Sequence, residues 1–489
     1  MSEKEKGTNN SRFREIISVL RKHNITHGIS PKKLRLIMED LGPTFVKIGQ
    51  IMALHSDILP KAYCDELMEL CTDARPMPFE EAVSVIDESY GRSWKKVFAS
   101  IEETPIGSAS IAQVHRAVLK SGEEVVVKIQ RKGIYEMMAR DIDFIRKAIK
   151  LMPPISLKGM ADFDLVLDEL WSVTRDEMNF LTEASNIEEF ARRNKDVNFV
   201  QTPVLYQQYT TVHVLVMEYI DGCGIDEKEK LLEDGYDLKE IGSKLVDNYI
   251  KQVMDDGFFH ADPHSGNVKI RDGKIVWIDM GMMGRLTEHD REMITLAIEG
   301  VALNDVGLIL KAVLGLGEFK ERPEQRKLYE DIEGLLLKYG STDMGKINVA
   351  EVMTDLMEVM KENKIMMPHG LTMLARGLTH MEGVLANIAP DINMVEIARA
   401  RLAADFLHNF NFKKELRNTG RSLLKSVRKM IDLPSMTTDL MDEFMKGQSK
   451  VNLDLRVSKD LAFLLRRLVR NIVMGLWVMA LLISSSIIC

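Results

Sequence analysis

The fold is decided by a short polar stretch between a long helical pattern and two short strands: His260-Ala261-Asp262-Pro263-His264-Ser265-Gly266-Asn267. The next hydrophobic strand ends in Asp279-Met280-Gly281. An amide oxygen from Asn267 and a carboxylate from Asp279 suit Mg²⁺, which prefers oxygen ligands in near-octahedral geometry. Asp262 can accept the proton of an attacking hydroxyl group during phosphoryl transfer. We therefore predict a phosphoryl-transfer site. A helix-capping aspartate and a turn asparagine would be the alternative if the pattern stood alone.

A lysine within a hydrophobic strand is the candidate for binding the phosphate groups. Lys128 interrupts the run Val125-Val126-Val127-Lys128-Ile129. In a phosphoryl-transfer site it would contact the α- and β-phosphates and pair with a glutamate from a helix. Glu177 and Glu183, on one predicted helix, are the candidate partners. The alternatives are an edge-strand lysine that faces solvent and a solvated acidic helix face.

Two further segments are candidates for binding the nucleotide. A GxGxxG loop is absent before Lys128, and a run of small residues stands in its place: Gly107, Ser108, Ala109, Ser110 and Ile111. Small residues let the backbone approach phosphates, although a plain strand turn is the alternative. The strand around 216–220 resembles a hinge. There the backbone groups of Glu218 and Ile220 would meet an adenine edge, with Met217 behind it.

Composition excludes several classes of protein. The chain has 489 residues, enough for two to four domains of roughly 100–200 residues each. Hydrophobic residues make up 45% and charged residues 28%, so a disordered chain is excluded. The net charge of −8 disfavours a nucleic-acid binder. Four cysteines without a CxxC pair exclude a disulfide scaffold and disfavour a cysteine zinc site.

The order of the patterns predicts an α+β fold. Residues 31–72 have helical periodicity, and short strands are predicted within 110–130 and 212–219. A long helix is predicted over 238–257, then a hairpin around 267–279, and the rest of the chain is helical in pattern. The strands do not alternate regularly with helices, so a doubly wound parallel sheet is excluded.

The C-terminal end has the composition of a membrane segment. From Ile472 to Cys489 the chain holds only apolar residues, Gly and Ser, after several basic residues. Such a run of about 18 residues is at the short end for a spanning helix. We expect a single transmembrane helix over 471–489, with the catalytic body on the cytoplasmic face. The alternative is a buried helix or a hairpin arm, and a second membrane helix stays open.

Together these motifs resemble the UbiB/AarF-domain family of atypical protein kinase-like proteins, from about residue 31 to the C-terminal helix. The matching segments are the Lys-x-Gly-Gln motif Lys47-Ile48-Gly49-Gln50, the small-residue loop 107–115, Lys128, Glu177, Glu183-Ala184, His260–Asn267, Asp279–Gly281 and, in the C-terminal lobe, Arg376-Gly377 with Met381-Glu382-Gly383. Each motif is weak alone, but their shared order is highly specific.

The resemblance implies a bilobal protein kinase-like fold, with an N-terminal helical extension and a mostly helical C-terminal lobe. The expected segments are a tail or helix over 1–30, the extension over 31–100, the N-lobe with inserted helices over 101–220, the C-lobe over 221–410, a helical linker over 411–470 and the membrane helix over 471–489.

Several positions depart from the family pattern. Asn179 replaces an aspartate and removes an anion, Gly107 replaces an alanine in the loop, and Met280 replaces a phenylalanine. None of these changes removes a metal ligand or Asp262. The sequence therefore does not indicate an inactive pseudokinase.

The extension carries a motif of its own. Lys47 and Gln50 are three residues apart and share a helix face. Gly49 inside a helix costs about 0.5–1 kcal/mol, which hints at a close backbone approach. A solvated face with a kink is the alternative. The resemblance implies that this helix covers the mouth of the active site, where Lys47 pairs with Glu177 in the place of a peptide substrate. That would favour ATP hydrolysis or a small or lipidic acceptor.

The leading hypothesis is therefore a membrane-tethered kinase or ATPase that uses ATP and Mg²⁺. The resemblance implies a role in isoprenoid quinone or related lipid metabolism. Its expected partners are the membrane, a membrane lipid or isoprenoid-like small molecule, and quinone-pathway enzymes, but not nucleic acid. A homodimer stays open. One alternative is an ATP-gated module that presents or extracts membrane lipids or enzymes without phosphoryl transfer. Another is a phosphotransferase of the aminoglycoside or choline kinase sort, which the extension and the membrane segment disfavour.

Overall fold

The computed structural model describes residues 3–24, 29–53, 60–70, 75–150, 171–172, 174–175, 177–319, 321–340, 349–398 and 401. The chain divides into two compact units, Met1–Ala404 and Asp405–Cys489. Every described residue belongs to the first unit, and the description below is of that unit alone.

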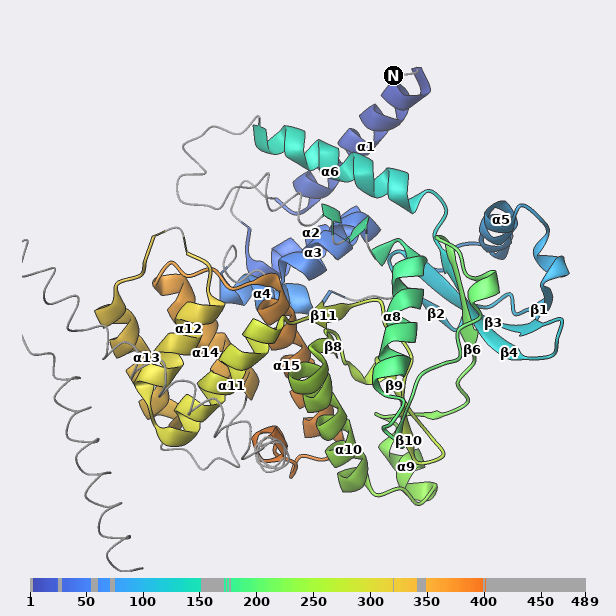
Figure 1. The fold of residues 1–489 in the computed structure, drawn as a ribbon. Helices are drawn as coiled ribbons and strands as arrows, with labels where there is room; N and C mark the ends of the chain where they lie inside the picture. The colour runs from blue at the N-terminus through green and yellow to red at the C-terminus, as the bar shows by residue number, and fades with distance from the viewer. Residues whose placement is uncertain are drawn as a thin grey trace, which may run out of the picture. The chain divides into compact units, whose positions relative to one another are not determined.

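A five-stranded antiparallel sheet builds the first lobe (Figure 1). The order is β1-β3-β4-β6, with β2 paired to β3. The strands are β1 (Phe98–Ile101), β2 (Gly107–Ser108), β3 (Ala112–Leu119), β4 (Glu124–Gln130) and β6 (Val214–Glu218). In this register Lys128 on β4 lies between Val114 and Leu215.

The β-branched residues of β4 explain why this strand is central. Successive side chains point to opposite faces of a sheet. Val125, Val127 and Ile129 pack into a core that includes residues of α5 (Phe79–Tyr90), whereas Val126 packs into the core shared with the second lobe. Lys128 is on the same face as Val126, so its ammonium is directed toward the second lobe.

Helices of the extension share an apolar cluster of their own that includes Ile37, Leu41, Phe45 and Leu67. They are α1 (Glu3–Lys22), α2 (Pro31–Leu41), α3 (Pro43–Met52) and α4 (Lys61–Met68). Ser30 caps α2 by accepting a hydrogen bond from the amide of Lys33, and Pro31 occupies the first turn, where its missing N–H costs little. Two helices connect the sheet to the rest, α6 (Ile134–Lys150) and α8 (Phe180–Arg193).

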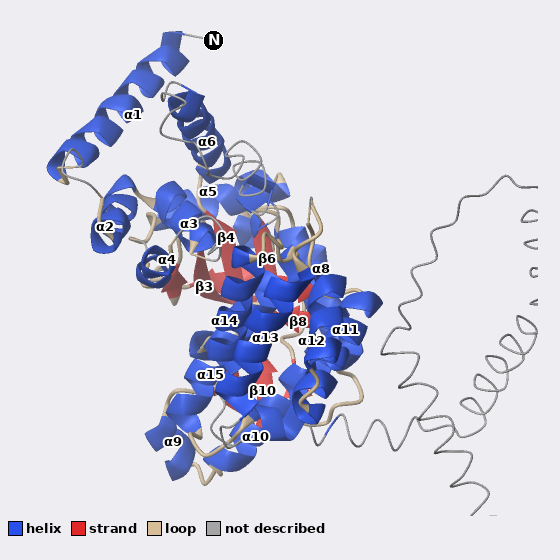
Figure 2. Ribbon diagram, turned by 90° about the vertical axis from the view of Figure 1, so that its left-hand side faces the viewer, coloured by secondary structure: helices blue, strands red, loops and turns tan. Residues whose placement is uncertain are grey.

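The second lobe surrounds short strands with helices (Figure 2). A four-stranded sheet has the order β5-β10-β9-β7, and β11 pairs with β8. The strands are β5 (Val200–Gln201), β7 (Cys223–Gly224), β8 (Phe258–His260), β9 (Val268–Arg271), β10 (Lys274–Trp277) and β11 (Met283–Arg285). The helices are α9 (Lys228–Glu233), α10 (Leu238–Lys251), α11 (Glu288–Leu303), α12 (Val306–Leu316), α13 (Gln325–Gly340), α14 (Val349–Glu362) and α15 (His369–Ile388).

These elements confirm the predicted α+β fold class and the kinase-like arrangement of a sheet lobe and a mostly helical lobe. The predicted hairpin is β9–β10, which turns at Asp272-Gly273 with both residues at positive φ. The helix predicted over 238–257 changes to a π-helical turn at Gln252–Asp256 and ends at Gly257, whose φ is +59°. That turn leads directly into β8 and the polar stretch.

The predicted membrane localisation requires correction. No helix within the described ranges is both long and apolar enough to cross a membrane. The two 20-residue helices, α1 and α15, contain charged residues such as Arg12 and Arg376. The expected membrane helix over 471–489 lies outside the described residues.

Candidate functional site

Three elements bring charged side chains together around Lys128. Its ammonium nitrogen on β4 lies 2.9 Å from both carboxylate oxygens of Glu183 on α8. It lies 3.0 Å from Oδ2 of Asp279, which follows β10. The side chains of Lys128 and Glu183 are 14% and 5% exposed, whereas that of Asp279 is 39% exposed. The structure thus places one cation between two carboxylates, of which that of Glu183 is buried and that of Asp279 is partly exposed. Lys128, Glu183 and Asp279 are called the lysine centre below.

Charge balance within this centre fixes the ionised state of its members. Burial disfavours the charged form of Lys128 and would lower its pKa. The carboxylates of Asp279 and Glu183 outweigh this effect, so the pKa of Lys128 is raised. Asp279 is only partly exposed, and the loss of water around it would raise the pKa of its carboxyl group. Lys128 and a hydrogen bond from the amide of Gly281 (2.8 Å) nevertheless hold its pKa well below the ordinary value. Burial, together with the carboxylates of Asp279 and Glu177, raises the pKa of Glu183 to about 7 against the pull of Lys128. Asp279 is therefore ionised.

The start of α8 explains how Glu183 reaches Lys128. Asn179 is the N-cap of α8, and its side-chain oxygen accepts a hydrogen bond from the amide of Leu181 at 3.1 Å. Asparagine caps a helix about as well as aspartate does. Glu183 lies in the first turn, where the helix dipole favours a negative charge. The departure at Asn179 thus removes an anion without removing the cap.

His260 connects the two parts of the predicted motif. Its Nδ1 accepts a hydrogen bond from the amide of Asp262 (3.1 Å), and its Nε2 lies 2.6 Å from the carbonyl oxygen of Asp279. The proton therefore sits on Nε2, which donates to that carbonyl. The ring is buried and stacks on Trp277 at 5.2 Å, and burial lowers its pKa, so it is neutral. The role of His260 was not evident from the sequence.

The predicted magnesium ligands have the chemistry that the ion requires. The amide nitrogen of Asn267 donates to the carbonyl oxygen of Asp262 at 3.0 Å, which orients its side chain and leaves the amide oxygen as the ligand atom. Asp279 is ionised and partly exposed. One amide oxygen and one carboxylate fit Mg²⁺, which usually completes its shell with water and phosphate oxygens.

Asp262 is held by two residues that sequence analysis did not place in the site. Its Oδ2 accepts a hydrogen bond from Arg376 (3.0 Å), and Nε2 of His380 lies 3.2 Å from its Oδ1. Burial would raise the pKa of Asp262, but Arg376 and His380 outweigh it and lower the pKa. Arg376 was recognised only as part of a family motif, and His380 was missed. Arg376 is 114 residues from Asp262 in the sequence, so no local pattern could have placed these two residues beside it.

The approach of α15 to the polar stretch depends on Gly377. A Cβ atom there would clash with the hydroxyl group of Tyr249 and lie 3.0 Å from the carbonyl oxygen of His260. Gly377→Ala is therefore expected to lower the free energy of unfolding by about 1–3 kcal/mol, measured by urea denaturation. Gly383→Ala on the same helix has open space and should raise it by about 0.5–1 kcal/mol. Equal effects of the two changes would contradict this packing.

The extension contributes an ion pair beside the lysine centre. The ammonium of Lys47 lies 2.6 Å from a carboxylate oxygen of Glu177, and the two side chains are 12% and 9% exposed. Gln50 donates instead to the carbonyl oxygen of Leu70 at 3.5 Å, within the extension. A Cβ on Gly49 would clash with the side chain of Leu70, so the close approach at this glycine is also within the extension.

The candidate nucleotide segments are placed differently. Gly107–Ile111 forms β2 and a turn, in which the amide of Ala109 donates to the carbonyl of Ala112 at 2.8 Å. In the hinge segment the amide of Glu218 already donates to the carbonyl of Val204 (2.8 Å), and the carbonyl of Ile220 accepts from Lys269 (3.1 Å). Met217 is buried in the core. Among the hydrogen bonds of the described residues, the carbonyl of Glu218 and the amide of Ile220 have no partner, so these two groups are available to an adenine edge.

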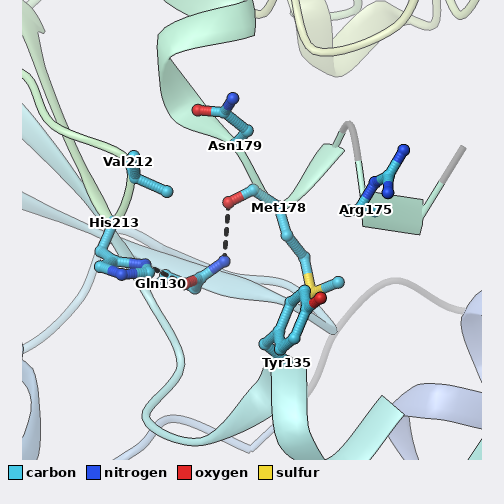
Figure 3. Close-up of a pocket in the computed structure, with 7 residues that line it drawn as sticks. All are labelled: Gln130, Tyr135, Arg175, Met178, Asn179, Val212 and His213. Atoms are coloured by element: carbon cyan, nitrogen blue, oxygen red, sulfur yellow. Dashed lines mark hydrogen bonds between the residues drawn. The ribbon is translucent and has the colours of Figure 1, made fainter. Parts of the chain in front are cut away.

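A pocket of about 260 Å³ lies elsewhere in the first lobe (Figure 3). Its lining comprises Gln130, Tyr135, Arg175, Met178, Asn179, Val212 and His213. The side chain of Gln130, which lines the pocket, donates to the carbonyl of Met178 at 2.8 Å. The pocket shares no residue with the lysine centre, so it is not part of the candidate phosphoryl-transfer site.

A sheet lobe with a Lys–Glu pair, joined to a helical lobe with an Asp–Asn loop and a strand-end aspartate, defines the protein kinase-like class. A model of the ABC1 atypical kinase-like domain matches residues 69–313, and one of the UbiB helical domain matches residues 332–393. The chain belongs to the ABC1 atypical kinase-like family.

Two relatives and one solved structure are similar to this chain. A Clostridium pasteurianum protein, described as uncharacterized in the hydrogenase 1 5' region, is 36% identical over 94% of this chain and 87% of its own length. The Arabidopsis thaliana protein ACTIVITY OF BC1 COMPLEX KINASE 8, chloroplastic, is 33% identical over 78% of this chain, which spans 54% of that relative. The structure of Rv3197 with erythromycin from Mycobacterium tuberculosis is 22% identical, covers 72% of this chain and 90% of its own, and has a TM-score of 0.48.

Proposed function

We propose that this protein is a Mg²⁺-dependent atypical kinase or ATPase that cleaves the terminal phosphoryl group of ATP. The observation that carries the proposal is the contact of Lys128 with both Glu183 and Asp279, next to a loop that presents Asp262 and Asn267. Members of this set supply a phosphate-binding cation, a metal ligand pair and a residue that orients the attacking oxygen.

Each residue has a proposed task in the reaction. Lys128 binds the α- and β-phosphates, and Glu183 holds its ammonium in place. Asp262, fixed by Arg376, orients the attacking hydroxyl group or water and receives its proton as the bond to the γ-phosphorus forms and the bond to the leaving ADP breaks. Mg²⁺ bound by Asn267 and Asp279 would neutralise phosphate charge.

The Lys47–Glu177 pair supports a small acceptor over a peptide. This ion pair is contributed by the extension and is almost fully buried beside the centre. We propose that the acceptor of the phosphoryl group is water or a small phenolic or isoprenoid-like molecule, such as a quinone precursor. If the acceptor is such a molecule, we propose that the enzymes that make or modify it are the protein's partners.

The test is ATP consumption by wild-type protein and Asp262→Asn, measured as phosphate release across a Mg²⁺ series. Nucleotide affinity should stay within about twofold, because Asp262 does not contact Lys128, whereas turnover should fall by about 10²–10⁴-fold. Wild-type protein that binds ATP with Mg²⁺ but converts none of it, with water or with a phenolic acceptor, would contradict the enzyme proposal.

A specific observation favours a second function, an ATP-gated binding module. Arg376 donates a hydrogen bond to Oδ2 of Asp262 and lowers the pKa of its carboxyl group, which makes this residue a weaker base. Tight binding without turnover in the same experiment would support that module.

A further inference from the structure

Arg131, the residue that follows β4, contacts two segments far apart in the sequence. Its Nε donates to the carbonyl of Ala109, and its Nη2 donates to the hydroxyl of Ser108 and to the carbonyl of Arg75, each at 2.8 Å. Its own amide donates to the carbonyl of Ile111, also at 2.8 Å. One arginine thus holds the small-residue loop and the chain segment that leads from the extension into α5.

Among the described residues, the guanidinium of Arg131 has only neutral hydrogen-bond partners. No carboxylate in the described part of the chain forms an ion pair with it, and burial lowers its pKa. Its partners are two carbonyl oxygens and one hydroxyl. A guanidinium that is held only by neutral acceptors leaves an uncompensated positive charge next to the loop, where it would attract phosphate.

The contact with Ala109 also sets the direction of the loop amides. In a trans peptide the carbonyl and the following N–H point in opposite directions. The carbonyl of Ala109 is turned toward Arg131, so the N–H of Ser110 is turned away from it. Backbone N–H groups directed to one side form an anion-binding concavity. Arg131 therefore fixes the loop in the form that offers an amide to a phosphate oxygen.

A second contact attaches the same chain segment to the sheet. The amide of Met77 donates to the side-chain oxygen of Gln113 at 2.8 Å, and Gln113 lies opposite Ser108 in the β2–β3 register. The segment 75–77 is thus joined to the loop by Arg131 and to β3 by Gln113. A displacement of this segment would be transmitted to the loop.

We propose that Arg131 is a positioning residue that holds the phosphate-binding loop in its binding form and couples it to the segment joining the extension to the first lobe. The ligand class is the polyphosphate of a nucleotide, so the part concerning affinity rests on the proposed function. The coupling of loop and segment does not depend on it.

The experiment compares Arg131→Gln and Arg131→Lys with Arg140→Gln, an exposed arginine on α6 that contacts only a carbonyl of its own helix among the hydrogen bonds of the described residues. Hydrogen exchange is measured without nucleotide at the amides of Arg75, Met77 and 107–112. In Arg131→Gln the amides of both segments should exchange faster than in wild type. In Arg131→Lys, which keeps the charge but has one nitrogen in place of the branched guanidinium, the increase should be smaller. No change in 75–77 while the loop loosens would overturn the coupling.

Affinity for ADP with Mg²⁺ is measured in the same samples by calorimetry, under conditions in which urea unfolding shows each variant to be folded. Arg131→Gln should bind ADP about tenfold more weakly than wild type, and Arg140→Gln should match wild type. Unchanged affinity in Arg131→Gln would overturn the loop-positioning role. Failure of wild-type protein to bind ADP would count against the proposed function, while the exchange data would still decide the coupling.

Discussion

Asp279→Asn is expected to lower Mg²⁺-dependent ATP turnover by at least about 10²–10³-fold, the scale seen when one electrostatic contributor to a transition state is removed. The change replaces an ionised carboxylate by a neutral amide of the same shape. Since Lys128 keeps both contacts with Glu183, its ammonium is not left unpaired. The loss should therefore appear in turnover and in the Mg²⁺ concentration required, measured by phosphate release across a Mg²⁺ series.

Asp391→Asn is the matched control for this experiment. Asp391 forms an exposed ion pair with Lys239, at 2.8 Å and with side chains 71% and 68% exposed, far from the lysine centre in sequence. Exposed pairs of this kind contribute little to stability, so turnover should equal that of wild type. Turnover in Asp279→Asn at the wild-type level would exclude Asp279 as a metal ligand.

Lys47→Met is expected to lower the free energy of unfolding by about 3–5 kcal/mol, because removing one partner of a buried ion pair leaves the other charge uncompensated. Glu177 is 9% exposed, and Lys47 is the cation beside its carboxylate. The measurement is urea denaturation followed by circular dichroism. Lys230→Met, which removes half of an exposed pair with Glu227, should change the free energy by less than about 0.5 kcal/mol.

A double-mutant cycle separates the ion pair from loss of packing around Lys47. If Glu177 is the source of the penalty, Lys47→Met combined with Glu177→Gln should be more stable than Lys47→Met alone. Free-energy changes that simply add would mean that the two side chains do not interact, despite the 2.6 Å separation of their charged atoms.

Much of the fold was predictable because local patterns agreed with the tertiary arrangement. The β-branched run around Lys128 predicted a buried strand, and the strand does lie inside the sheet. The polar stretch 260–267 was predicted to lie between a helix and a hairpin. It does lead into the hairpin strand β9, but the short strand β8 that stands between the helix and the stretch was not predicted. In both cases the decisive residues are close together in the sequence.

The parts that escaped prediction depend on tertiary contacts. Nothing near Asp262 in the sequence indicates that Arg376 and His380 surround it. Gly49 suggested a close backbone approach, but its partner, the side chain of Leu70, was not evident from the sequence. The amide of Glu218 was expected to meet adenine, yet it is bonded to the carbonyl of Val204. Spacing along the chain does not encode such partners.

The contact of Asp262 with Arg376 spans 114 residues, and this separation has a consequence for the newly made protein. At a synthesis rate of about 5–20 residues per second, the ribosome needs roughly 6–23 s to make the chain between these two positions. During that interval every other member of the lysine centre, up to Asp279, has already been synthesised. A nascent or prematurely terminated chain therefore carries the phosphate-binding half of the site without the arginine that orients Asp262. Capacity to bind nucleotide would arise before capacity to use it.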